Sequence, residues 1–347
     1  MPRFFGFVRD QYTALPLPPT PADIAQQTFV VTGANTGLGF QCAQHLLGMG
    51  AGRVILGVRS VQKGEAALAA MRQATGRHEA GAGTVWELDL QSLDSVEKFS
   101  QRLATLDRLD ALVANAGVVM TERQIVQGIE LSLLVNVVAT MLLALRTLPK
   151  LQASARKFNT TPRLVIVSSN SALESNMKGA VPSAGGVDVF DKLSEEDGFG
   201  TFSQYPKTKL LQIYAVRQLA LLLPVATTAG GVVINAVSPG LCYTDLDRNA
   251  SRPAKVVLAI MRKLLARTAE AGSRTLLQAA FAGPDSHGAY CSECRVKNED
   301  VPAWITNASG KTTQERVWND ILKRLDAMGH GVDVAALAAP APSARVV

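Results

Sequence analysis

The sequence of 347 residues is long enough for one large domain or two small ones. Hydrophobic residues make up 47% of it and charged residues 18%, which excludes a globally disordered chain. The net charge of +6 is spread along the chain without a block of consecutive Lys or Arg, so we expect no nucleic-acid partner.

Short apolar runs alternate with stretches of helical periodicity from residue 28 onward. We expect strands at 28–31, 53–58, 84–88, 111–114, 164–168 and 232–237. We expect helices between residues 39 and 49 and at 63–74, 92–104, 131–148 and 205–223. This alternation predicts a single α/β domain of the Rossmann type, a doubly wound parallel sheet of about seven strands with helices on both faces.

The segments outside this pattern differ in composition. Residues 1–27 are rich in proline and predict an irregular N-terminal arm, the domain follows over 28–330, and residues 331–347 predict a flexible tail. Residues 170–204 form a long connection that predicts an inserted lobe. The longest apolar stretch, 131–145, is too short to span a membrane, so we expect no transmembrane segment.

The four cysteines are Cys42, Cys242, Cys291 and Cys294. No apolar leader precedes them, which favours a reducing, cytoplasmic setting. Cys291 and Cys294 form a Cys-x-x-Cys pair without a second pair or neighbouring histidines. We therefore expect ordinary thiols and no metal, with a zinc or redox site as the less favoured alternative.

A glycine-rich loop, TGANTGLG at 32–39, joins the first strand to the first helix. Glycines let the backbone approach a pyrophosphate closely, and the helix then points its first amides at the phosphates. The loop predicts dinucleotide binding, with a purely structural turn as the alternative. The residues expected to contact the cofactor are Gly33, Asn35, Thr36, Gly37, Leu38 and Gly39.

The glycine spacing, TGxxxGxG, resembles that of the short-chain dehydrogenase/reductase family. The second strand ends at Arg59 and carries no acidic residue there. An acidic side chain at the end of this strand binds the ribose hydroxyls of NAD, whereas an arginine binds the 2′-phosphate of NADP. We therefore expect NADP(H), with a plain surface Arg as the alternative. The resemblance adds further cofactor contacts at Asp89, Leu90, Asn115, Ala116, Gly117, Pro239, Gly240 and Thr244.

The segment YPKTK places Tyr205 and Lys209 four residues apart, on one face of a helix. A lysine ammonium beside a phenol lowers its pKa, so that Tyr205 can exchange a proton with a carbonyl or alcohol oxygen. Both residues are also expected at the cofactor. Because Pro206 is tolerated only in the first turn of a helix, that helix is expected to begin close to Tyr205.

The resemblance supplies two more catalytic residues. Ser169 takes the serine position that steadies the substrate oxygen, with Ser168 as the alternative if the register differs by one residue. Asn136 takes the place of the asparagine that holds a water in the proton relay to the lysine. The alternative is an Asn whose side chain is satisfied by backbone. No histidine lies near these motifs, so a hydrolase or metal mechanism has no support.

In the family, the segment after Pro239-Gly240 closes over the substrate, here residues 241–275. It includes a basic helix at 252–267 whose apolar face is expected to line a lipophilic pocket, with weak contact to an anionic membrane surface as the alternative. Cys242 and Tyr243 are placed to reach that pocket. The resemblance also implies dimerisation through 131–148 and 205–223.

Several segments are similar to the retinol-dehydrogenase-like branch and to fungal members from secondary-metabolite pathways. These include 271–275, 286–290 and the RVW of 316–318. The implied function is NADP(H)-dependent reduction of a lipophilic ketone or aldehyde, or oxidation of the matching alcohol. The alternative is a non-catalytic NADP(H)-binding or scaffold protein of the same fold.

Overall fold

The computed structural model describes residues 2–174, 187–197, 199–200, 203–225, 231–244, 263 and 265–338. Its centre is an eight-stranded sheet in the order β10-β9-β8-β7-β4-β1-β2-β3. All neighbours in it pair in parallel except β10, which runs antiparallel to β9 at one edge. The strands are β1 (Thr28–Thr32), β2 (Arg53–Val58), β3 (Gly83–Glu87), β4 (Ala111–Ala114), β7 (Arg163–Val167), β8 (Val233–Ser238), β9 (Tyr290–Ser292) and β10 (Arg295–Val296).

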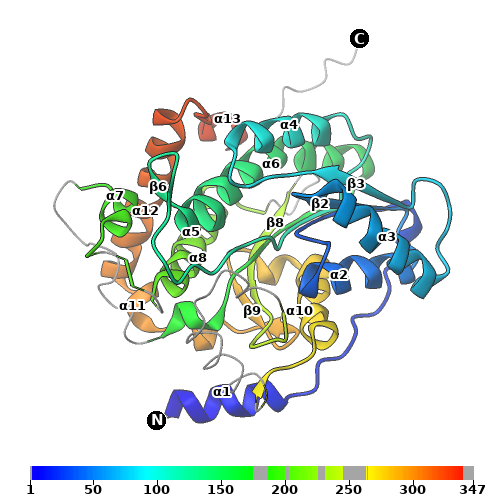
Figure 1. Ribbon diagram of the computed structural model, residues 1–347, viewed down its shortest axis with the longest axis horizontal. Coiled ribbons are helices and arrows are strands. Elements are labelled where there is room, and N and C mark those ends of the chain that lie inside the picture. Colours follow the sequence, from blue (N-terminus) through cyan, green and yellow to red (C-terminus); the bar gives the residue numbers. More distant parts are fainter. Residues whose placement is uncertain are drawn as a thin grey trace.

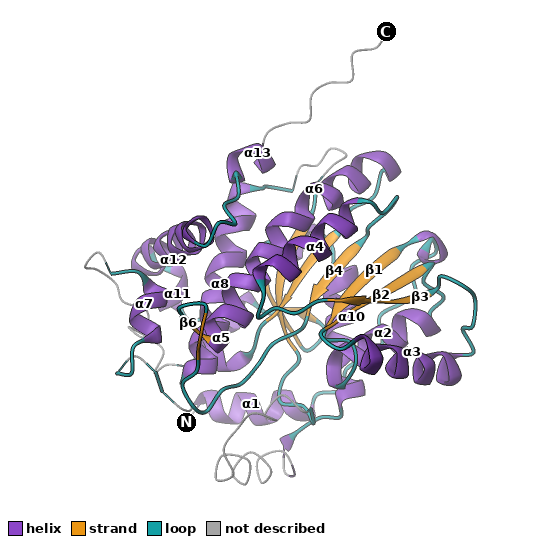
Figure 2. Ribbon diagram, turned by 45° about the horizontal axis from the view of Figure 1, so that its top comes forward, coloured by secondary structure: helices purple, strands orange, loops and turns teal. Residues whose placement is uncertain are grey.

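Helices cover both faces of this sheet, as Figure 2 shows. One face carries α2 (Gly37–Gly48), α3 (Val61–Thr75) and α10 (Ala269–Phe281). The other carries α4 (Leu93–Ala104), α6 (Thr140–Phe158) and α8 (Gln204–Leu222). Strands β1, β4 and β8 are buried along their whole length, as expected of parallel strands covered on both sides. The predicted doubly wound sheet is therefore confirmed, and the predicted strands begin or end within one residue of those observed.

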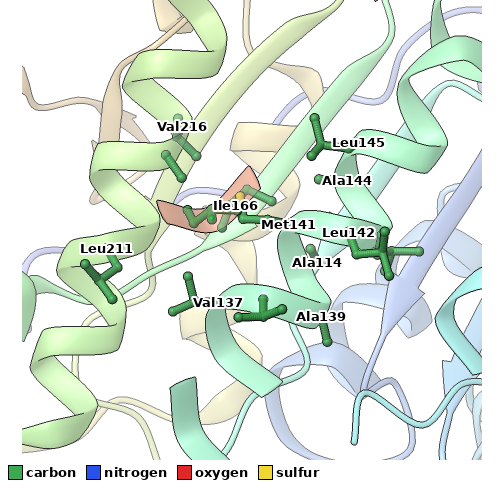
Figure 3. Close-up of a cluster of buried hydrophobic side chains, with 14 of the residues drawn as sticks. Ala114, Val137, Ala139, Met141, Leu142, Ala144, Leu145, Ile166, Leu211 and Val216 are labelled. Atoms are coloured by element: carbon green, nitrogen blue, oxygen red, sulfur yellow. The ribbon is translucent and has the colours of Figure 1, made fainter. Parts of the chain in front are cut away.

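The apolar helix predicted at 131–148 is longer than expected. It consists of α5 (Leu131–Leu133), a π-helical turn (Leu134–Ala139) and α6, and it continues through Pro149 to Phe158. The continuation buries Leu151 and Ala155, so packing outweighs the hydrogen bond that proline lacks. The whole helix is apolar and long enough for a membrane, but 94% of its most apolar 18-residue window is buried inside the protein. Figure 3 shows its side chains meeting Leu211 and Val216 of α8 and Ile166 of β7.

The expectation of an irregular N-terminal arm is wrong for its first part, because α1 (Pro2–Tyr12) is helical. Figure 1 shows α1 at the lower edge of the molecule, below β9 and α10. A short 3₁₀ turn, η1 (Ile24–Gln26), then leads into β1. The proline-rich composition correctly indicates the irregular residues between α1 and η1. It gives no indication of the short helix that precedes them.

The expectation of a flexible tail is wrong as far as residue 338. The helix α13 (Val334–Ala338) packs on α6, and the Gln152 amide donates to the carbonyl of Leu337 at 2.9 Å. Before it, α11 (Ala303–Thr306) leads into α12 (Ala308–Ala327), which packs on α8 and buries Trp318. The C-terminal helices thus cover part of the two helices through which dimerisation was expected.

The predicted lobe and lid lie partly outside the described residues. Of the lobe, 175–186, 198 and 201–202 lie outside, and its described part contains a 3₁₀ turn, η3 (Asn170–Leu173), and α7 (Val189–Ser194). Of the lid, 245–262 and 264 lie outside. A two-stranded hairpin, β5 (Ile125–Val126) and β6 (Ile129–Glu130), stands beside α7.

Candidate active site

A cavity of about 620 Å³ opens at the carboxyl ends of the parallel strands. Its walls come from the loops after β1, β2, β3, β4, β7 and β8, which bring together residues far apart in the sequence. Every predicted site residue lines this cavity except Gly39 and Asn136, which lie directly behind its wall. The lining residues that had been predicted are Gly33, Asn35, Thr36, Gly37, Leu38, Arg59, Asp89, Leu90, Asn115, Ala116, Gly117, Ser169, Tyr205, Lys209, Pro239, Gly240 and Thr244.

The glycines of the loop stand where the backbone leaves no room for a side chain. Without side chains at these positions, the backbone can approach a pyrophosphate closely. Gly33 and Gly37 have positive φ angles of 65° and 60°. A Cβ on Gly39 would lie 2.5 Å from Asn115 Nδ2 and 2.6 Å from the carbonyl oxygen of Gly33. α2 begins at Gly37, so its first amides and the positive end of its dipole face the cavity, where an anion is favoured.

Asn115 and Ala116 tie the end of β4 to the glycine loop. The side-chain amide of Asn115 donates to the Thr32 carbonyl at 2.9 Å, and the Ala116 N–H donates to Thr32 Oγ1 at 2.9 Å. The next residue, Gly117, stands close to two other site residues. A Cβ there would lie 3.1 Å from Asn136 Oδ1 and 3.7 Å from Lys209 Nζ.

Arg59 lies at the end of the cavity where β2 finishes. It is exposed, and the next residue, Ser60, caps α3 by accepting a hydrogen bond from the Lys63 N–H. Asp89 also lines this end, where its carboxylate accepts a hydrogen bond from the Gln91 N–H at 3.0 Å. A guanidinium free to reorient beside the cavity suits a phosphate on an adenosine ribose.

Tyr205 and Lys209 lie on one face of α8, which begins at Gln204 as Pro206 requires. Lys209 is 3% exposed, and its Nζ lies 5.4 Å from the centre of the Tyr205 ring. Burial lowers the pKa of Lys209 to about 7. Burial raises the pKa of Tyr205 above its usual range, and a hydrogen bond with Ser169 partly opposes that rise. Tyr205 therefore holds its proton at neutral pH in the protein alone.

The two candidate serines after β7 have different surroundings. Ser168 is buried and its hydroxyl donates to the Lys209 carbonyl at 3.0 Å, which fixes β7 against α8. Ser169 is half-buried, and its hydroxyl contacts Tyr205 and accepts from the Ser171 N–H at 3.2 Å. The geometry favours Ser169 for a contact with substrate.

Asn136 sits inside the π-helical turn and is fully buried. Its side-chain oxygen accepts from the Val118 N–H at 2.8 Å, and its amide donates to the Val118 carbonyl at 2.9 Å and to Thr208 Oγ1 at 3.0 Å. The side chain thus joins the loop after β4 to α8. These contacts satisfy the side chain without a water.

Comparisons with known proteins agree with this arrangement. The sequence profile described as short chain dehydrogenase matches residues 27–189. The short chain dehydrogenase/reductase dmxR8 of Cryptosporiopsis sp. is 38% identical over 332 residues, which cover 94% of this chain and 98% of that protein. The chain belongs to the short-chain dehydrogenase/reductase family. The short chain dehydrogenase FGM9 of Gibberella zeae is 34% identical and covers 92% of this chain and 90% of its own length.

Solved structures of the family share the fold. A 3-oxoacyl (acyl-carrier-protein) reductase from Agrobacterium tumefaciens with NADP bound has a TM-score of 0.58 at 21% identity and covers 78% of this chain and 93% of its own. Salutaridine reductase from Papaver somniferum has a TM-score of 0.55 at 21% identity, and the match covers 76% of this chain and 99% of that structure's chain. The predicted membership and its resemblance to fungal relatives are both confirmed.

The start of α8 is anchored by residues that the motifs did not single out. The buried Gln204 donates to Glu130 Oε2 at 3.0 Å and to the Leu193 carbonyl at 3.2 Å. Glu130 in turn caps α5 by accepting from the N–H groups of Ser132 and Leu133. Only its position directly before Tyr205 could have indicated from the sequence that Gln204 helps to place the start of α8.

Gln11 of α1 is a second unexpected component, since no motif marks the N-terminal segment. It is 5% exposed and donates to the carbonyls of Leu241 and Leu265 at 2.9 and 2.7 Å, while accepting from the Leu241 N–H at 3.0 Å. Arg267 donates to the Gln11 and Pro239 carbonyls. α1 therefore holds both described ends of the lid segment, and its Phe7 lines the cavity.

The remaining predicted residues are not equally close to the cavity. Cys242 lines it, and burial raises the pKa of its thiol to about 12, whereas Tyr243 is largely exposed and does not line it. Cys291 and Cys294 lie on the β9–β10 hairpin, where burial raises their pKa values to about 12 and about 11. High pKa values suit unreactive thiols.

Three carboxylates beside that hairpin, those of Asp10, Glu293 and Asp300, lie close enough together to hold a cation. The ammonium of Lys297 already lies within 2.8 Å of all three. Burial alone would lower the pKa of Lys297, but hydrogen bonds to these carboxylates raise it above the ordinary value. The cluster fastens α1 to the C-terminal part of the sheet.

We predict that Lys209 makes folding stability depend on pH. An unfolded lysine titrates near 10.5 and folded Lys209 near 7, so the unfolded chain binds more protons between these values. Stability of the wild type relative to Lys209→Met should rise with pH across this window, by up to about 1.4 kcal/mol per pH unit. Denaturant unfolding at pH 6 to 10 measures the difference.

Lys311→Met is the matched control, because Lys311 is exposed on α12. Its difference from the wild type should be the same at every pH. A Lys209→Met difference that is equally flat would contradict the prediction.

We also predict that Gln11→Ala weakens the attachment of α1. The substitution leaves partly buried backbone groups of Leu241 and Leu265 without their partner, so the free energy of unfolding should fall by about 1–3 kcal/mol. Gln26→Ala removes an exposed amide and should cost much less. Equal losses for the two variants in denaturant unfolding would rule out the role given to Gln11.

Proposed function

We propose that this protein is an NADP(H)-dependent oxidoreductase that reduces a lipophilic ketone or aldehyde, or oxidises the matching alcohol. The observation that carries the proposal is a single cavity lined by the glycine loop and, opposite it, by Tyr205, Lys209 and Ser169. The family acts on alcohols and carbonyls, so the proposal concerns the cofactor, the roles of these residues and the substrate class.

NADP(H) is favoured by the end of the cavity at β2. Arg59 is exposed there, and no acidic residue ends that strand to bind a free ribose hydroxyl. Among proteins that share the fold, RhlG from Pseudomonas aeruginosa was solved with NADP and a dehydrogenase from Sphingobium yanoikuyae with NADPH. When bound, the nicotinamide would supply or accept the hydride.

The proton would be handled by Tyr205. Its phenol is protonated in the protein alone and would donate to the carbonyl oxygen of a substrate in the reductive direction. The Lys209 ammonium would stabilise the phenolate left behind, since an opposite charge nearby favours the ionised form. The Ser169 hydroxyl would donate to the same substrate oxygen and stabilise its developing charge.

A lipophilic substrate suits the apolar side chains that line the cavity. They include Phe7, Val119 and Leu241, together with the neutral thiol of Cys242. The fungal relatives support a role in a secondary-metabolite pathway, as the resemblance implied. A cytoplasmic location remains a prediction. For 252–267 the prediction remains that its apolar face lines the pocket, with contact to a membrane surface as the alternative.

A homodimer also remains a prediction, and it needs a surface other than the covered face of α8. Arg217 and Gln218 of that helix already contact Gln314 of α12, at 3.3 and 2.9 Å.

Replacing Tyr205 by Phe removes the proposed proton donor while keeping the ring. We expect the rate of carbonyl reduction to fall about 10²- to 10⁴-fold, because that is the usual contribution of a positioned acid. NADPH oxidation with a screened set of lipophilic ketones and aldehydes measures it. NADPH should still bind, and Tyr12→Phe, which alters an exposed phenol, should keep the wild-type rate. An unchanged rate in Tyr205→Phe would favour the scaffold alternative.

Replacing Arg59 by Ala tests cofactor choice. Loss of a charge-assisted contact with the 2′-phosphate should raise the Kd for NADPH about 10- to 100-fold and leave that for NADH nearly unchanged. Fluorescence titration of both cofactors measures this. Arg156→Ala is the control, since Arg156 is exposed at the far end of α6 and does not line the cavity. Equal NADPH affinity in Arg59→Ala and wild type would exclude the assignment to Arg59.

A further inference from the structure

Gln212 lies three residues after Lys209 on α8 and is 1% exposed. Its side-chain amide donates to the main-chain carbonyl of Asn136 at 2.6 Å. Its side-chain oxygen accepts from the Lys209 ammonium at 3.1 Å. One buried side chain therefore spans the distance between the π-helical turn and the lysine.

The two partners leave only one orientation for this amide. A carbonyl can only accept and an ammonium can only donate, so the Gln212 NH₂ must face Asn136 and its oxygen must face Lys209. The flipped amide would set two donors against each other and two acceptors against each other. The oxygen beside Lys209 is thus held in place by the main chain of another helix.

Lys209 Nζ has three N–H donors, and two of them are accounted for. One is donated to the Val167 carbonyl of β7 at 2.8 Å and one to Gln212. Among the described residues no other hydrogen-bond acceptor of Lys209 is recorded, and the ammonium lines the cavity. With two donors fixed by β7 and α8, the third is left for the cavity.

Within the part of the chain that the structure describes, no carboxylate faces Lys209. Tyr205 faces it from its own helix, and the thiol of Cys242 acts on Tyr205 from the loop after β8. Val167 of β7 and Asn136 of the π-helical turn present uncharged main-chain groups, the latter through Gln212. Burial lowers the pKa of the ammonium to about 7, so an accepted hydrogen bond matters for its charge near neutral pH.

We propose that Gln212 is a positioning residue that links Asn136 directly to Lys209, in the place where the family resemblance puts a water, and keeps the lysine charged and aimed at the cavity. The role given to Lys209 rests on the proposed function. A water donates and accepts through the same oxygen and can relay a proton, whereas a carboxamide donates only through its nitrogen and accepts only through its oxygen. Gln212 therefore orients the lysine without passing protons to it.

The test compares Gln212→Met and Gln212→Glu with wild type. Met keeps the volume but offers no comparable acceptor, so the pKa of Lys209 should fall by about one unit. Glu places a negative charge beside the ammonium, so that pKa should rise by at least about one unit. The first readout is the free energy of unfolding of cofactor-free protein as a function of pH. Each protein is compared with the same protein carrying Lys209→Met, and the quantity read is the pH at which the difference begins to rise. It should move down in Gln212→Met and up in Gln212→Glu.

The second readout is the alkaline limb of kcat/KM for carbonyl reduction, which should shift in the same two directions. Gln218→Met is the matched control: it lies on the same helix and also loses one side-chain hydrogen bond, to Gln314 at 2.9 Å. It should lower stability equally at all pH values.

The proposal would be overturned if the pH at which stability begins to rise were unchanged in Gln212→Met, or if it moved in the same direction in both variants. Gln212→Met decides the matter alone if Gln212→Glu does not fold. The stability readout needs neither cofactor nor substrate. Failure of the proposed function would therefore appear only in the kinetics, whereas failure of the Gln212 proposal would appear in both readouts.

Discussion

The cavity is organised around a buried cation, Lys209, that has no carboxylate partner among the described residues. An ammonium out of water needs acceptors for its protons, and Lys209 finds them in the Val167 carbonyl and the Gln212 amide. A carboxylate would satisfy it more strongly but would also cancel its field. Neutral acceptors leave the charge to act on Tyr205, whose ring centre lies 5.4 Å away.

One of these acceptors, the Gln212 amide, is held by the π-helical turn at Leu134–Ala139. Such a turn changes the hydrogen-bond register inside a helix, and it often marks a functional site. Here it places the Asn136 side chain against the loop after β4 and its carbonyl against Gln212. The same residue thus fixes both the loop that lines the cavity and the amide that orients the lysine.

The cofactor half of the site could be predicted from the sequence because it consists of local units. A strand, a glycine loop and a helix follow one another within about twenty residues, and their periodicity and glycines are visible directly. The pair Tyr205 and Lys209 was likewise visible as spacing on one helix. Asn136 was predicted, but its hydrogen bonds to Val118 and Thr208 depend on segments that periodicity does not bring together.

The substrate half could not be predicted because its contacts join the ends of the chain. Gln11 meets Leu241 across 230 positions and Asp10 meets Lys297 across 287. No sequence pattern indicates which residues a glutamine in a proline-rich segment will contact. The helix that carries it is also too short to be predicted reliably from its own sequence, because short isolated helices are marginally stable. α1 supplies Phe7 to the cavity and holds both described ends of the lid segment. Part of the shape of the pocket therefore depends on an N-terminal segment that carries no family motif.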